Sequence, residues 1–137
     1  MTFQRCLAEN GFLTYHFKGT SMEPMLKQGR DLFTVVPKGQ ARCQKYDMVL
    51  YRRPPDQYVL HRVVEVRPDS YVILGDNCVA KEYGIREEDI LGVMTSFLHK
   101  GRQVPVTDWR YRAYCHIWVF LYPVRRFLKQ VKGHLCR

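Results

Sequence analysis

One serine of the sequence lies in a segment whose residues favour a fixed turn. In "KGTSMEPML", residues 18–26, Ser21 follows Gly19, which permits unusual backbone angles, and precedes Pro24, which fixes the direction of the chain. A serine hydroxyl becomes a nucleophile when a turn holds it beside a base and near donors for an oxyanion. The alternative is a helix N-cap, because Ser21 followed by Glu23 and Pro24 is equally typical of a helix start.

A histidine and an aspartate further along provide a candidate base and a candidate orienting acid. His61 lies in "YVLHRVVEV", where the alternation of a strand places it on one face with Val59 and Val63. Asp76 follows another strand-like run, in "LGDN". With Ser21, these residues can form a nucleophilic set, which is recognised by the roles of its members and not by their positions. The alternative for His61 is a core histidine bonded to a carbonyl group.

Four segments, "GTSMEPML", "KYDMVLYRRP", "YVLHRVVEV" and "LGDN", resemble in order and spacing the sequence boxes of the type I signal peptidase family. The resemblance runs from about Gly19 to Phe97. It implies the β-rich fold that this family shares with the self-cleaving SOS repressors. It further implies that Ser21 is the nucleophile and that His61 is the general base, as in the histidine-containing branch of the family. No cofactor and no metal is implied.

The resemblance also points to residues around this pair. The histidine-containing branch carries acids in the "GDN" box and about six residues later, which implies that Asp76 or Glu82 orients the base. The family often places a serine two residues before the nucleophile as an oxyanion donor, where this chain has Gly19. Thr20 or a backbone amide would then serve as the donor, and Met22 is expected to line the substrate cleft.

The elements that must position these residues are short strands. Between residues 11 and 100, β-branched and aromatic runs alternate with Gly, Pro, Asp and Asn, which is typical of an antiparallel β protein. Strands are predicted at 12–17, 31–36, 47–53, 58–66, 70–75 and 90–97. The predicted fold is therefore mainly β, with a C-terminal amphipathic helix, and the resemblance specifies the signal-peptidase or SOS-repressor type.

The C-terminal segment has a different pattern, so the chain is divided into a β domain at 1–107 and a basic amphipathic helical tail at 108–137. Apolar residues follow helical spacing at Ile117, Phe120, Leu121, Val124, Leu128 and Val131. Basic residues lie on an adjoining face at Arg125, Lys129 and Lys132, and Pro123 is expected to kink the helix or to begin its second part. The continuous apolar run, "YCHIWVFLYPV", is shorter than the roughly 20 residues that span a bilayer.

Charge is concentrated in this tail. Residues 1–107 contain 15 Lys and Arg against 12 acids, whereas residues 108–137 contain 7 against 1, which divides the net charge of +9 into +3 and +6. The excess predicts an anionic membrane surface as a partner of residues 110–135, with Trp118, Tyr122 and Phe127 at the interface, and no nucleic acid is expected. The alternative is a helix that packs on the β domain.

Composition narrows the cellular setting. The five cysteines are scattered without a C-x-x-C pair, which argues against a disulfide framework and a zinc site. The N-terminal residues contain no apolar run typical of a signal or anchor, so we expect a cytoplasmic or peripherally membrane-associated protein.

Taken with the resemblance, these features predict a serine endopeptidase that cuts a leader or signal peptide after small residues, with a peptide or preprotein as substrate. Two alternatives stay open. One is a self-processing protease similar to the SOS repressors. The other is an inactive module that binds peptides or docks on membranes.

Overall fold

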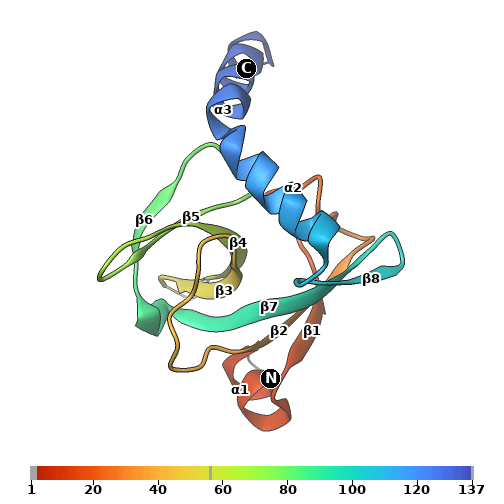
Figure 1. The fold of residues 1–137 in the computed structure, drawn as a ribbon, viewed down its shortest axis with the longest axis vertical. Helices are drawn as coiled ribbons and strands as arrows, with labels where there is room; N and C mark the ends of the chain where they lie inside the picture. Colours follow the sequence, from red (N-terminus) through yellow and green to blue (C-terminus); the bar gives the residue numbers. More distant parts are fainter. Residues whose placement is uncertain (1–2, 56, 137) are drawn as a thin grey trace.

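Eight strands form one antiparallel sheet in the computed structural model, which describes residues 3–55 and 57–136 (Figure 1). The strands are β1 (Leu13–His16), β2 (Leu32–Pro37), β3 (Met48–Arg53), β4 (Gln57–Val66), β5 (Tyr71–Leu74), β6 (Glu82–Ile85), β7 (Ile90–His99) and β8 (Arg102–Pro105). Their order is β1-β2-β7-β3-β4-β5-β6, and β8 pairs with β7. The prediction of a mainly antiparallel β fold with C-terminal helices is confirmed.

All six predicted strands are present, with ends shifted by up to two residues. Two further strands, β6 and β8, were missed because neither carries an alternating apolar pattern. The β6 sequence, "EYGI", has Gly84 at a φ of 75° in its middle, and the β8 sequence, "RQVP", is half polar. Each is short and pairs with one neighbouring strand, so backbone hydrogen bonding and not side-chain burial defines it.

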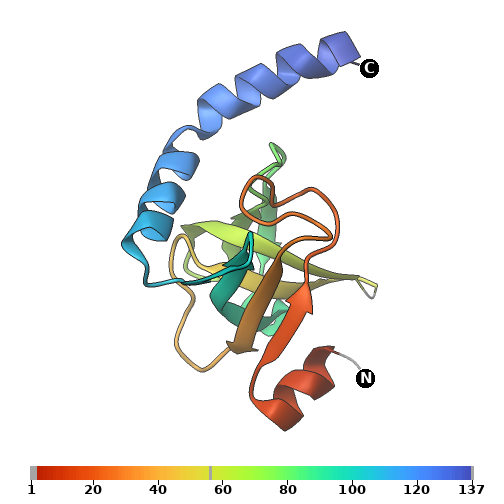
Figure 2. The same ribbon diagram turned by 90° about the vertical axis from the view of Figure 1, so that its right-hand side faces the viewer.

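Four helical segments accompany the sheet (Figure 2). They are α1 (Phe3–Asn10), the 3₁₀ turn η1 (Glu87–Asp89), α2 (Trp109–Phe120) and α3 (Tyr122–Cys136). The sequence did not predict α1, which buries Leu7 in the core at the end of the sheet remote from residues 18–30. Pro123 is the second residue of α3, which confirms that it lies at the start of a second helical part.

The main core joins the tail to the sheet. Tyr111 and Cys115 of α2 are buried with Met22, Met25 and the facing β strands. Asp108 caps α2 by accepting hydrogen bonds from the backbone N–H groups of the next turn. The division at residue 107 therefore coincides with the start of a helix, but the first turns of that helix belong to the core of the β domain.

Beyond the core, α3 extends past the sheet after a bend between the two helices (Figure 2). Among residues 3–55 and 57–136, no helix combines the length and the apolarity that crossing a bilayer requires.

Candidate active site

Ser21 lies on the loop that connects β1 to β2. Residues 21–25 form successive turns and no helix follows them, so the alternative of a helix N-cap is wrong. Gly19 has a φ of 88°, a conformation that a residue with a Cβ rarely adopts. The buried side chains of Met22 and Met25 anchor the loop to the core, while Ser21 remains half-buried at the surface. Met22, which was expected at the cleft, is thus a core residue.

His61 meets this serine from β4. The ring Nε2 of His61 lies 2.9 Å from the Ser21 hydroxyl, across forty residues of sequence. The register of β3 and β4 sets Val49 opposite His61 and Tyr51 opposite Val59, so Tyr51 and His61 are diagonal neighbours on one face. The structure therefore brings together the two residues that the sequence selected as nucleophile and base.

A hydrogen-bonded chain of Tyr51 and Glu82 begins at the other ring nitrogen of His61, Nδ1. The Tyr51 hydroxyl lies 3.3 Å from His61 Nδ1 and donates a 2.7 Å hydrogen bond to the Glu82 carboxylate, which also accepts from Arg53. Because the Tyr51 proton is engaged with Glu82, its oxygen is the acceptor for His61 Nδ1–H. This arrangement leaves Nε2 unprotonated and able to accept the proton of Ser21.

Burial sets the charge state of this group. The pKa of His61 is lowered from 6.5 to about 4, chiefly because burial desolvates the ring; the Glu82 charge opposes this effect and the Arg53 charge adds to it. Burial and the neighbouring Glu82 raise the pKa of the Tyr51 hydroxyl. At neutral pH the imidazole is therefore uncharged, as a general base must be, and Tyr51 keeps its proton.

Asp76, the other candidate acid, has a different set of partners. Its two carboxylate oxygens accept hydrogen bonds of 2.9 Å from Nε and Nη2 of Arg62, whose side chain is fully buried. A third bond, of 2.6 Å, comes from the Tyr114 hydroxyl. Within the described residues it makes no hydrogen bond to His61, although its charge raises the pKa of that ring. Of the two expected acids, Glu82 is the one connected to His61 by hydrogen bonds.

Asn77 of the "LGDN" segment holds the serine loop through two hydrogen bonds. The backbone N–H of Asn77 donates to the Ser21 carbonyl at 2.8 Å, and its side-chain amide donates to the Thr20 carbonyl at 3.0 Å. Gly75 lies where these chains cross. A Cβ on Gly75 would approach the Ser21 carbonyl oxygen to 2.7 Å and His61 Nε2 to 2.9 Å. No local pattern in the sequence indicates this role of Gly75, because it depends on the close approach of two distant segments.

Gly75→Ala is expected to separate Ser21 from His61 without unfolding the protein. The added methyl group must displace a backbone atom of the serine loop or the imidazole itself. A misplacement of about 1 Å at a reacting group costs on the order of a hundredfold in rate. The rate at which a fluorophosphonate probe labels Ser21 measures this loss, and Gly39→Ala, at a site with open space around the glycine, is the matched control. Equal labelling of both variants would contradict this account.

Potential oxyanion donors lie at the start of the serine loop. Gly19 has no side chain to offer, and its backbone N–H donates to the Gln28 side chain. Thr20 is exposed, and its carbonyl is held by Asn77. Within the described part of the chain, the backbone N–H of Ser21 has no acceptor, so it is available as a donor beside the hydroxyl.

An open groove of about 610 Å³ contains Ser21 and His61. Its walls come from the end of β1 and the following residues, from β4, and from Phe33, Leu50, Arg53 and Cys78. Within the described residues, β1 pairs with β2 alone. Residues 57–61 of β4 pair with β3 alone, because the pairing of β4 with β5 begins at Arg62. Both strands contribute residues to the groove that holds the serine and the histidine.

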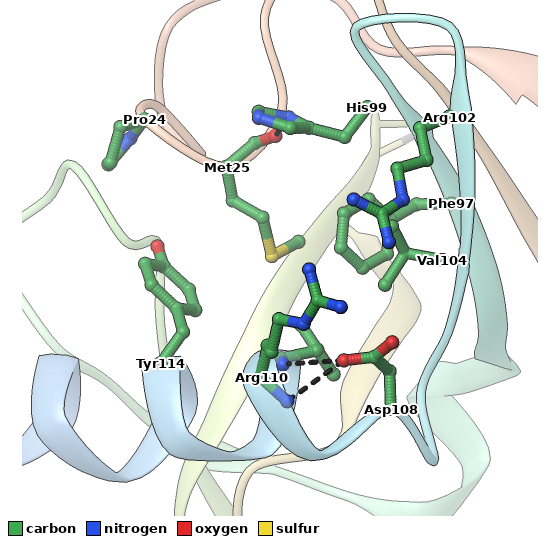
Figure 3. Close-up of a pocket in the computed structure, with 10 residues that line it drawn as sticks. Pro24, Met25, Phe97, His99, Arg102, Val104, Asp108, Arg110 and Tyr114 are labelled. Atoms are coloured by element: carbon green, nitrogen blue, oxygen red, sulfur yellow. Dashed lines mark hydrogen bonds between the residues drawn. The ribbon is translucent and has the colours of Figure 1, made fainter.

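A second pocket, of about 360 Å³, lies behind the serine loop (Figure 3). It is lined by Pro24, Met25, Phe97, His99, Arg102, Val104, Asp108, Arg110, Tyr111 and Tyr114. Figure 3 shows the Asp108 carboxylate turned to the backbone N–H groups at the start of α2, at 2.8 and 3.4 Å. This acid is a helix cap, and the pocket does not include Ser21 or His61.

Comparison with protein-family models, with curated proteins and with solved structures finds no match to this chain. Among the described residues, no group of three or more His, Cys, Asp or Glu side chains is arranged to hold a metal ion. The resemblance to signal peptidases therefore depends on the four sequence segments alone. The geometry around Ser21 is the other observation that bears on function.

Proposed function

We propose that the protein is a serine endopeptidase of the signal peptidase type, with Ser21 as nucleophile and His61 as general base. The observation that carries the proposal is the 2.9 Å contact between Ser21 Oγ and His61 Nε2 at the wall of an open groove. The chain of hydrogen bonds through Tyr51 to Glu82 selects the tautomer that this role requires.

The reaction follows from the positions of these groups. Ser21 Oγ bonds to the carbonyl carbon of the substrate while His61 Nε2 takes the hydroxyl proton, and the carbonyl oxygen becomes an oxyanion beside the Ser21 N–H. The carbon–nitrogen bond then breaks, His61 returns its proton to the leaving amine, and an acyl ester remains on Ser21. Water, deprotonated by His61, hydrolyses this ester and regenerates the serine.

An extended peptide fits the groove as a substrate. The groove runs beside β1 and the first half of β4, and addition of a peptide strand beside a sheet is a general mode of peptide recognition. The resemblance implies small residues, often alanine, before the cut. Glu82 and Tyr51 are positioning residues in this scheme, because they act on the substrate through His61.

Self-processing is the less favoured form of the same chemistry. The described N-terminal helix α1 packs its Leu7 into the core and lies at the end of the sheet remote from the serine loop (Figure 2). This segment is therefore not in a position to enter the groove of its own molecule. Intact mass after prolonged incubation separates self-cleavage from action on added peptides.

The test uses peptides that carry alanine before the cut, incubated with the full chain, and product masses identify the bond broken. We expect cleavage by the native protein and by Ser70→Ala, a substitution of another half-buried serine, and none by Ser21→Ala. A fluorophosphonate probe, which phosphonylates a serine oxygen with loss of fluoride, should label the same proteins. Labelling that persists in Ser21→Ala, or absence of labelling in the native chain, would favour the inactive peptide-binding module.

The pH dependence of labelling provides an independent prediction. Because the pKa of His61 is lowered to about 4, the base should remain active through mildly acidic pH, and labelling should fall only as pH decreases through that value. Glu82→Gln removes a charge that raises the pKa of His61, so the fall should move to lower pH, whereas Glu88→Gln, at an exposed site, should leave it unchanged. An inflection near 6.5 in all three proteins would contradict the burial argument.

A further inference from the structure

Exposed apolar side chains of this protein are concentrated on the two C-terminal helices. Seven of them form one stretch: Ile117, Phe120, Leu121, Val124, Phe127, Leu128 and Val131. Phe120 is 82% exposed and Phe127 is 64% exposed, although these are among the largest apolar side chains of the chain. The other exposed large apolar residues, among them Phe12 and Tyr83, are scattered over separate elements. A contiguous apolar surface of this kind marks an interaction site.

Other side chains of the same helices bind residues 76–79, which follow β5. Four side chains one to two turns apart donate hydrogen bonds to carbonyl oxygens of residues 76–79: Trp118, Tyr122, Arg125 and Lys129. Arg125 also lies over the Trp118 ring, with its guanidinium carbon 4.6 Å from the ring centroid. These contacts fix the rotation of the helices about their axes and leave the seven apolar side chains, which we call the outer face, exposed to solvent.

These contacts also reduce the number of basic side chains that a partner of the tail could bind. Arg125 and Lys129, expected beside a membrane, are bound to the loop, and Trp118 and Tyr122 are turned to the body. Exposed basic residues remain at Arg112, Arg126 and Lys132, among others, and Asp108 is the one acid of residues 108–137. The outer face is thus apolar, and the exposed residues of the same helices carry an excess of positive charge. Residues 133–135, at the end of the expected range, have side chains outside the described part.

We infer that the outer face is a peripheral docking site for an anionic lipid surface. An apolar stripe flanked by basic residues buries its side chains at the boundary of headgroups and acyl chains, while the charges attract anionic lipid. The fifteen residues of α3 combine apolar and basic side chains in one amphipathic helix, as in helices that lie on a membrane. Because the helices hold residues 76–79, and Asn77 holds the serine loop, docking through the outer face would tether the Ser21 loop to the membrane-bound helices.

The experiment is flotation of the full chain with vesicles of phosphatidylcholine, alone or mixed with phosphatidylserine. The native protein should float with the mixed vesicles at low salt, much less at high salt, and little with phosphatidylcholine alone. Phe120→Gln/Phe127→Gln/Leu128→Gln should lower the partition coefficient by on the order of a hundredfold or more. Phe12→Gln/Tyr83→Gln, at exposed sites elsewhere, is the matched control and should float as the native protein does. Arg126→Gln and Lys132→Gln should each cost about fivefold.

Equal flotation of the tail variant and the control would overturn the inference, as would equal binding to neutral and anionic vesicles. Native protein that stays unbound but forms a dimer, with the tail variant monomeric, would assign the outer face to a second copy of the chain. Probe labelling of Ser21, measured without lipid, should be the same in the tail variant and the native protein. Flotation does not depend on Ser21, so Ser21→Ala should float normally, and failure of the catalytic proposal is distinguishable from failure of this one.

Discussion

Ser21→Ala and His61→Ala are each expected to lower the rate of peptide cleavage by about a millionfold, to the level that binding alone supports. Removal of Ser21 leaves no atom to form the acyl ester. Removal of His61 leaves a hydroxyl whose proton has no acceptor at 2.9 Å, since Nε2 of that ring is the base beside it. The two residues act as one unit, so the double variant should be no slower than either single variant.

Folding must be intact for this comparison to be informative. Ser21 is half-buried, so Ser21→Ala should change thermal unfolding little, whereas His61→Ala removes a buried ring and should lower the melting temperature; cleavage is therefore compared at a temperature at which both variants are folded. Ser70→Ala and His116→Ala are the matched controls, because each removes the same side chain at a site outside the groove. A His61→Ala variant that retains cleavage within tenfold of the native rate would exclude this histidine as the general base.

The sequence alone indicated Ser21 and His61, the proposed nucleophile and base, because both lie in segments with recognisable local patterns. Ser21 lies between a glycine and a proline, and His61 lies in an alternating strand. Tyr51 is equally part of the site but resembles any aromatic residue of a β strand. Its role depends on the register of β3 against β4, which brings it diagonal to His61, and on the arrival of Glu82 from β6. Such pairings between distant segments leave no local signal.

The structure of the helical tail could also be predicted from the sequence only in part. Spacing of apolar residues predicted the helix and the break near Pro123, but the apolar stripe suited a lipid surface and a protein core equally well. In the structure, Tyr111 and Cys115 at the start of the tail enter the core, whereas Phe120 and Phe127 further along are exposed. The direction of the helix after Leu121 determines this difference, and that direction depends on contacts to residues 76–79.

No sequence pattern singled out Arg62, yet this residue explains the role of Asp76, the second candidate for the orienting acid. Its guanidinium lies within the core, where Asp76 supplies the compensating charge. Further hydrogen bonds reach the Tyr46 carbonyl and the Tyr111 hydroxyl. An aspartate in a "GDN" turn after a strand is therefore suited to a structural role, and its place fifteen residues after His61 does not distinguish that role from catalysis.

Asp76→Asn is accordingly expected to destabilise the fold by about 3–5 kcal/mol, because it leaves the buried charge of Arg62 without a counter-charge. This loss corresponds to a decrease of on the order of 10–20 °C in the melting temperature. Glu82→Gln should cost far less, because the ion pair of Glu82 with Arg53 is partly exposed to solvent. Arg62→Met/Asp76→Leu, which removes both charges, should recover much of the stability lost in the single variant.

Thermal unfolding measured alongside the pH profile of Ser21 labelling distinguishes the two acids. An Asp76→Asn variant that unfolds at the native temperature but shifts that profile would make Asp76 the orienting acid, and Glu82 would then have no part in positioning His61.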